Sequence, residues 1–274
     1  MTLTSFFSNK SIPTLQSHAN ESLAKLFDWF TANKLTLNTD KTCYTVFSNA
    51  KKKPRVTLSL NGTEVLGVSV SKYLGIYLDE NLNWKNHVSH IITKLNQLSG
   101  AFHYLAKYID NDRINQIYYA YVFPYIKYGI EIFGTCDSTT LKPLQTAQNK
   151  ILKTLCKKKR RYPTDKLHNE LNILKCEDIH KLFVGIFVYK QQNNLLPTIF
   201  SNYFHARNNI HNIQTRNSER LFVPRCRLKT CQKSIKFAGV KIWNSIPQDI
   251  IGAPKLNNFK YKYKKFLISS YNQA

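Results

Sequence analysis

Two adjacent pairs of carboxylates are the residues of this sequence that could hold a metal ion for catalysis. Asp79 and Glu80 follow a predicted strand, and Glu177 and Asp178 begin a predicted helix. Carboxylate oxygens bind Mg²⁺ and support two-metal chemistry when they converge on one point. Acidic residues are also ordinary in turns and in the first turn of a helix, where they accept backbone N–H groups. We therefore interpret both pairs as local caps and expect no metal site.

The other chemical signatures of an enzyme are missing from the sequence. His87 and His90 can share one face of a helix, and we interpret them as polar surface residues and not as metal ligands. No glycine-rich phosphate loop, His-Glu-x-x-His or Ser/His/Asp signature occurs. The six cysteines are scattered and form no Cys-x-x-Cys pair, which predicts reduced thiols. These residues alone predict a chain without a catalytic centre.

Positive charge is the strongest chemical signal in the chain. The 274 residues include 40 Lys and Arg against 16 Asp and Glu, which gives a net charge of +24. Residues 151–274 carry 24 of the basic and 6 of the acidic residues. Such an excess repels itself unless a polyanion is the partner, and cations placed on phosphates release condensed counterions. Nucleic acid is the expected partner, and a basic surface without a partner or an anionic membrane are the alternatives.

A membrane is the weaker of these partners. The basic residues are spread over many segments instead of one amphipathic helix, and no apolar run is long enough to span a bilayer. The first residues also lack the basic start and apolar run of a secretory signal. We therefore expect an intracellular protein of the nucleus or cytoplasm, without a membrane partner.

Five consecutive cations stand out between two predicted helices. Like charges this close cannot all be paired internally, so the run is expected to be solvated or to lie on a polyanion. In the tail, Lys262, Lys264 and Lys265 lie beside tyrosines, whose rings can stack on bases, although most rings are expected to pack in the core. The run consists of Lys157, Lys158, Lys159, Arg160 and Arg161.

The spacing of apolar residues predicts an α+β fold. Residues 13–32 have the period of an amphipathic helix, and apolar residues alternate on both sides of Asn61-Gly62, which predicts a hairpin. A strand over 71–78 would complete a small antiparallel sheet. From residue 81 to about 157, three helical stripes predict a bundle, the second of them ended or kinked at Pro124. A helix at 177–192 and two closing helices in the tail follow.

Several motifs occur in a fixed order along the chain. They are Trp29-Phe30-x-x-Asn33-Lys34-Leu35, Asn38-x-x-Lys41, Val70-x-x-Tyr73-Leu74-Gly75-Ile76, Pro224-Arg225-x-Arg227 and Ile242-Trp243-Asn244-Ser245-Ile246-Pro247. Together they resemble the reverse transcriptases of non-LTR retrotransposons of the jockey/LINE type. The motifs span nearly the whole chain.

The resemblance implies three parts, with roles for several residues. Residues 1–80 would be a palm remnant, 81–157 a helical thumb and 158–274 a basic helical C-terminal region. Tyr73, Leu74 and Gly75 would form a primer-grip-like strand. Lys41 would assist the leaving pyrophosphate, with a surface lysine as an equal alternative. The run 157–161 and the basic tail would bind template RNA or target DNA, the tail through Arg225, Arg227, Lys262, Lys264 and Lys265.

The resemblance also implies a missing catalytic centre. In this family the Tyr-x-Asp-Asp motif, whose aspartates hold two metal ions, would precede the segment corresponding to Ser5-Phe6-Phe7-Ser8, and the sequence contains no such motif. We expect a fragment of an RNA-directed DNA polymerase that binds template–primer, is inactive alone and binds no cofactor, with Mg²⁺ serving the full-length polymerase. The alternatives are a stand-alone RNA- or DNA-binding protein and a subunit that completes a split polymerase with an upstream half.

Overall fold

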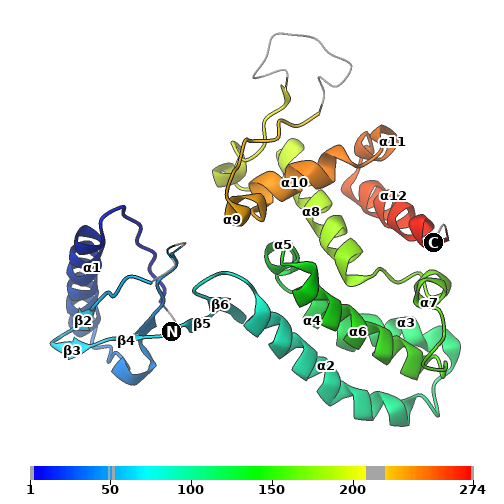
Figure 1. Ribbon diagram of the computed structural model, residues 1–274, viewed down its shortest axis with the longest axis horizontal. Coiled ribbons are helices and arrows are strands. Elements are labelled where there is room, and N and C mark those ends of the chain that lie inside the picture. The colour runs from blue at the N-terminus through cyan, green and yellow to red at the C-terminus, as the bar shows by residue number, and fades with distance from the viewer. Residues whose placement is uncertain (1–2, 49, 51–52, 208–219, 273–274) are drawn as a thin grey trace. The chain divides into compact units, whose positions relative to one another are not determined.

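Helices dominate the protein, as expected for the predicted α+β class (Figure 1). The strands of the described residues form three short two-stranded sheets. The computed structural model describes residues 3–48, 50, 53–207 and 220–272. The chain divides into two compact units, Met1–His87 and Val88–Ala274. The division into palm, thumb and C-terminal parts stays a prediction. In the described residues no helix combines the length and apolar character needed to cross a membrane.

Helix α1 (Ile12–Ala32) confirms the helix predicted at 13–32. Pro13 lies in its first turn, where a missing backbone N–H leaves no hydrogen bond unmade. Trp29 and Phe30 lie on or beside the apolar stripe of this helix, which predicts that both rings pack in the core. Phe30 is buried, but Trp29 is 49% exposed, so this prediction is wrong for Trp29. The helix packs through Ala19 on a cluster of buried aliphatic residues, namely Val56, Leu58, Leu60 and Val65.

The sheets of the first unit are small and separate. Strand β1 (Cys43–Tyr44) pairs with β4 (Leu66–Gly67) in parallel. Strands β2 (Ser59–Leu60) and β3 (Thr63–Glu64) form the antiparallel hairpin predicted around Asn61-Gly62. Both turn residues have positive φ, 48° at Asn61 and 76° at Gly62, which is the conformation that this dipeptide favours.

A second hairpin replaces the single strand predicted over 71–78. Strand β5 (Val70–Tyr73) runs antiparallel to β6 (Ile76–Asp79), with Tyr73 opposite Ile76. Leu74 and Gly75 make the two-residue turn with φ values of 45° and 82°. The prediction of a single strand was wrong because leucine gives no turn signal, and Gly75 is the one residue of this two-residue turn whose type favours a reversal.

The predicted three-helix region contains two long helices and a broken one between them. Helices α2 (Lys85–Leu105) and α6 (Ser138–Leu155) are continuous. The broken helix begins with the 3₁₀ turn Asn111–Arg113 and continues as α3 (Ile114–Ile117). A π-helical turn (Tyr118–Val122) then leads into α4 (Phe123–Lys127), and α5 (Ile130–Phe133) follows. Pro124 lies in the first turn of α4, directly after the π-helical turn. The predicted interruption at Pro124 is thus accommodated without ending the helical path.

Helix α8 (Cys176–Gln192), predicted at 177–192, is the centre of the second unit. It contacts α5 and α6 and also the two predicted closing helices, α10 (Ile235–Asn244) and α12 (Leu256–Ser269). Shorter elements join these helices. They are α7 (Thr164–Glu170), α9 (Lys229–Gln232), α11 (Gln248–Ile251), and the 3₁₀ turns Thr198–Phe200 and Ser270–Asn272.

Candidate nucleic-acid interface

The run of five cations forms the connection between α6 and α7, and all five residues are exposed. Helix α6 ends in a Schellman motif, in which the N–H of Lys158 donates to the carbonyl of Lys153 (2.9 Å) and the N–H of Lys157 donates to that of Thr154 (3.2 Å). Lys157 occupies the left-handed position of this motif, with φ of 53°. Glycine is preferred there, so the backbone holds a lysine in a costly conformation.

One side chain of the run contacts a ring, and a lysine of α6 holds the backbone of the run. The ammonium of Lys158 lies 4.6 Å from the ring centroid of Tyr162, and the Tyr162 hydroxyl donates to Glu170 at 2.8 Å. Lys153 donates to the carbonyl of Arg160 at 2.7 Å and so fixes the backbone of the run. The loop therefore has a fixed backbone and exposes five cationic side chains to solvent.

The tail lysines lie on α12, on different sides of the helix. Lys262 and Lys265 are exposed, whereas Lys264 is half-buried. The Lys264 ammonium donates to the hydroxyl of Tyr119 at 3.1 Å and lies 5.5 Å from its ring centroid. Sequence reasoning missed this contact, because Tyr119 is 145 residues away along the chain. Lys264 thus has a structural partner, and Lys262 and Lys265 face outward.

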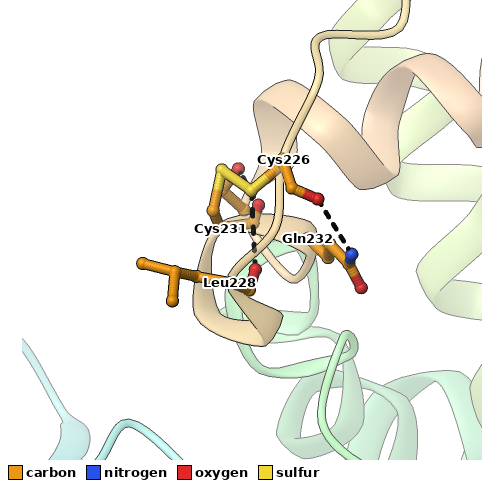
Figure 2. Close-up of a disulfide and its surroundings, with 5 residues drawn as sticks. Cys226, Leu228, Cys231 and Gln232 are labelled. Atoms are coloured by element: carbon orange, nitrogen blue, oxygen red, sulfur yellow. Dashed lines mark hydrogen bonds between the residues drawn. A yellow bond between two sulfur atoms is a disulfide. The ribbon is translucent and has the colours of Figure 1, made fainter. Parts of the chain in front are cut away.

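Arg225 and Arg227 are exposed on both sides of Cys226. A disulfide joins Cys226 to Cys231 in α9, with their Cα atoms 6.2 Å apart, so the prediction of six reduced thiols is wrong for this pair (Figure 2). The chain reverses direction at α9 and so brings Cys231 close to Cys226, although the spacing of these two cysteines matches no common motif. Gln232 also donates to the carbonyl of Cys226 at 3.0 Å. The two arginines therefore project from a pinned loop.

The primer-grip-like residues form the tip of the β5–β6 hairpin. Leu74 is 68% exposed, in a left-handed conformation that bulky residues rarely adopt. Tyr73 contacts Phe6 edge to face, with ring centroids 5.6 Å apart. Lys41 is exposed at the end of a 3₁₀ turn (Thr39–Lys41), and its backbone N–H donates to the Asn38 side chain at 3.0 Å. The roles of these four residues stay predictions.

One carboxylate of each acidic pair forms hydrogen bonds within the fold. The buried Asp79 carboxylate accepts the backbone N–H groups of Asn81, Asn83 and Trp84 at 3.0–3.1 Å and so orders the turn into α2. Asp178, at the start of α8, accepts the hydroxyl of Tyr271 at 2.5 Å. In the described residues no three His, Cys, Asp or Glu side chains gather as metal ligands.

Burial makes several histidines and thiols of this protein unreactive. His87 is 2% exposed, so our interpretation of it as a surface residue is wrong. His180 on α8 is also buried, and burial lowers its pKa to about 4. Burial raises the pKa of Cys136 and of Cys156 to about 11. These thiols stay protonated at neutral pH and are poor nucleophiles.

Ion pairs use other lysines than the candidate ones. Asp165 lies 2.9 Å from Lys175, and Asp137 lies 3.0 Å from Lys233. Glu177 and Asp178 both lie 3.0 Å from Lys181. Within the described parts of the chain, no ion pair joins a carboxylate to any of the ten candidate cations of the run and tail. Their charge is therefore not neutralised by the protein.

Residues of the motif Ile242 to Pro247 pack in the core and form hydrogen bonds with Leu221. Trp243 is buried and lies 5.8 Å from Phe259, centroid to centroid. The Asn244 amide accepts the N–H of Leu221 at 3.0 Å and donates to its carbonyl at 2.9 Å. Leu221 also forms a β-bridge with Ala206, so the asparagine completes the second edge of this short extended segment. With Arg220, the motif lines a cavity of about 230 Å³.

About half of the chain is similar to curated polymerases of mobile elements. A 136-residue stretch is 29% identical to the "RNA-directed DNA polymerase from mobile element jockey" of Drosophila funebris, covering 47% of this chain and 14% of the relative. The jockey polymerase of Drosophila melanogaster is 28% identical over 152 residues, 54% of this chain and 16% of the relative. The "Probable RNA-directed DNA polymerase from transposon X-element" of Drosophila melanogaster is 25% identical over 132 residues, 47% of this chain and 14% of the relative.

These relatives confirm the resemblance to non-LTR retrotransposon reverse transcriptases. The matched stretches span 14–16% of the relatives' own length. No protein-family model matches the chain, and no solved structure matches it.

Proposed function

We propose that this chain is a fragment of a non-LTR retrotransposon RNA-directed DNA polymerase that binds template–primer and does not polymerise by itself. The observation that carries the proposal is the set of cations, all but Lys264 exposed, that form no ion pair within the described residues of a chain similar to jockey polymerases. Phosphates are the groups that these side chains would neutralise, so binding depends on salt and only weakly on base sequence.

Three groups of cations would contact phosphates. The run from Lys157 to Arg161 offers five charges on a loop fixed at both ends by α6 and α7. Arg225 and Arg227 add planar guanidinium groups suited to two-point contacts with phosphate. Lys262 and Lys265 extend the charge along α12. RNA and DNA are both expected partners, because phosphate contacts do not distinguish them.

The hairpin tip supports a second part of the proposal. Leu74 combines 68% exposure with φ of 45°, and an apolar side chain kept exposed in a strained turn suggests a function in binding. Tyr73, Leu74 and Gly75 would hold the primer end. Lys41 would place its ammonium near the leaving pyrophosphate once the rest of the active site is present.

Catalysis would need acidic side chains that converge on metal ions, and in the described residues no three His, Cys, Asp or Glu side chains gather in this way. Two-metal polymerisation requires acidic side chains converging on two Mg²⁺ ions, and here Asp79 and Asp178 are committed to backbone N–H groups and to a tyrosine hydroxyl. Mg²⁺ would serve the full-length polymerase. No resident cofactor of this chain is proposed.

Primer extension and binding together test the proposal. We expect the purified chain to bind a labelled template–primer and to give no extension product with Mg²⁺ and the four dNTPs. Extension above a no-protein control, or an absence of binding at low salt, would contradict it. Repeating the binding measurement at increasing salt gives the contribution of the phosphates.

The second candidate is a subunit that completes a split polymerase. The three two-stranded sheets of the first unit favour it, since such sheets are marginally stable and leave edges that further strands can pair with. Adding a separately purified segment that contains Tyr-x-Asp-Asp and the preceding palm should then restore extension. A mixture as inactive as the chain alone would exclude this candidate.

A further inference from the structure

Helix α12 has an outer face on which a tyrosine lies among lysines. Tyr261, Lys262 and Lys265 are all exposed. Lys265 follows Lys262 by three residues and Tyr261 by four, so it lies beside both of them on the surface of the helix. Tyr261 is 69% exposed, whereas Tyr263, two residues later, is 1% exposed in the core. The exposed ring is therefore not needed to fill the interior.

All charged side chains of α12 are positive. Residues 256–269 contain four lysines and no aspartate or glutamate. Lys264 contacts Tyr119, and Lys262 makes a long contact of 3.4 Å with the backbone carbonyl of Asp249. Lys265 lies one helical turn after Tyr261 and has no ion-pair partner in the described residues. An anionic polymer that also carries flat apolar rings is complementary to this face.

We propose that the outer face of α12 binds single-stranded nucleic acid, with a base stacked on Tyr261 and the flanking phosphates on Lys262 and Lys265. This inference rests on the proposed function and specifies the form of nucleic acid. A single strand can turn an unstacked base toward the ring, whereas the bases within a duplex already stack on their neighbours. The face therefore selects single strands over duplexes.

An anionic membrane fits this helix less well. Membrane-surface helices insert an apolar face between lipid head groups. The apolar side of α12, with Phe259, Tyr263 and Leu267, is buried in the protein, where the helix packs on α8. Phe266 is 42% exposed, but one phenylalanine ring does not form an apolar face. The helix keeps its charge but has no apolar face to insert.

Binding by the full chain tests the inference with three variants. We expect Tyr261→Ala to weaken binding to an unstructured strand of about 20 nucleotides by about 5-fold or more, because stacking on one base contributes that much. Binding to a duplex of the same length should change less than about 2-fold. Tyr261→Phe keeps the ring and should bind as the wild type. Tyr121→Ala is the matched control, since Tyr121 is 57% exposed and has no basic residue one turn away on its helical segment.

The outcomes separate this inference from the proposed function. If the wild type binds both nucleic acids in a salt-dependent way but Tyr261→Ala binds like the wild type, the stacking role of α12 is wrong and the proposed function stands. Equal losses for strand and duplex also contradict the inference. If vesicles of anionic phospholipid bind and lose affinity with Tyr261→Ala while nucleic acid does not, the face binds membranes instead. Absence of any binding to strand or duplex overturns both.

Discussion

Single residues in this protein show how burial and backbone conformation set chemical properties. His180 is the clearest case. Its ring packs so closely on Gly134 that an added Cβ would clash with it, and its buried Nε2 atom has no hydrogen-bond partner among the described residues. Burial disfavours the charged ring, so its pKa falls to about 4. The residue is therefore a neutral core residue at physiological pH.

Acid should destabilise the protein through His180. The folded pKa of about 4 is below the value of about 6.5 in the unfolded chain, so the unfolded state binds more protons between these values. Stability is full above about pH 6.5 and falls as the pH decreases, by about 2 kcal/mol at pH 5. Denaturant unfolding at pH 8 and pH 5 measures this loss. His180→Leu should reduce the difference between the two pH values, and an unchanged difference would assign it to other groups.

Lys157 allows charge and folding to be separated. Because it has φ of 53° at the end of α6, Lys157→Gly should raise the free energy of unfolding by about 1 kcal/mol while removing one cation. We expect a higher melting temperature together with weaker binding to nucleic acid. Lys158→Gly is the control, since Lys158 is not among the residues with positive φ and should gain no stability. A lower melting temperature for Lys157→Gly would contradict the backbone argument.

At the scale of elements, side chains form hydrogen bonds with backbone groups that no neighbouring strand or helix satisfies. Asp79 satisfies the turn before α2, and Asn244 supplies the second edge of the extended segment at Leu221. Trp243 and Asn244 of the C-terminal motif therefore have a structural explanation within this chain. Asn244 anchors the segment around Leu221 to α10.

Asn244→Asp tests this anchor with a change of a single group. The carboxylate cannot donate to the Leu221 carbonyl and would face it with a negative charge, so we expect a loss of about 1–2 kcal/mol for this half-buried site. Thermal unfolding gives the measurement. Lys241→Ala, an exposed change on the same helix, should lose much less. Equal melting temperatures for Asn244→Asp and the wild type would show that the amide contacts do not stabilise the fold.

For the whole molecule, charge is the dominant property. The net charge of +24 is concentrated in residues 151–274, and the described carboxylates form ion pairs with other lysines than the candidate cations. The protein therefore keeps a large outward positive field, which favours fast and weakly sequence-specific association with polyanions.

A salt series on the full chain measures how the charge is used. Replacing the residues 157–161 by alanine should weaken template–primer binding and reduce the slope of log affinity against log salt by about 0.9 for each phosphate that is no longer neutralised. The melting temperature should change little, because the side chains are exposed. A control variant with the same reduction in charge should keep most of the slope; it replaces Lys10, Lys25, Lys34, Lys72 and Lys85. Equal slopes for both variants would show that net charge alone determines binding.

Local patterns in the sequence were sufficient to predict the α+β class, α1, the Asn61-Gly62 hairpin, the long helices and the outward charge of 157–161, because periodicity, turn chemistry and like-charge repulsion act between near neighbours. The reversal at Leu74-Gly75, the burial of His87 and His180 and the exposure of Trp29 required the folded chain, since leucine gives no turn signal and a helical stripe does not say which neighbours cover it. The contact of Lys264 with Tyr119 and the pairing of Asn244 with Leu221 likewise depend on segments far apart in sequence, which only the packed fold brings together.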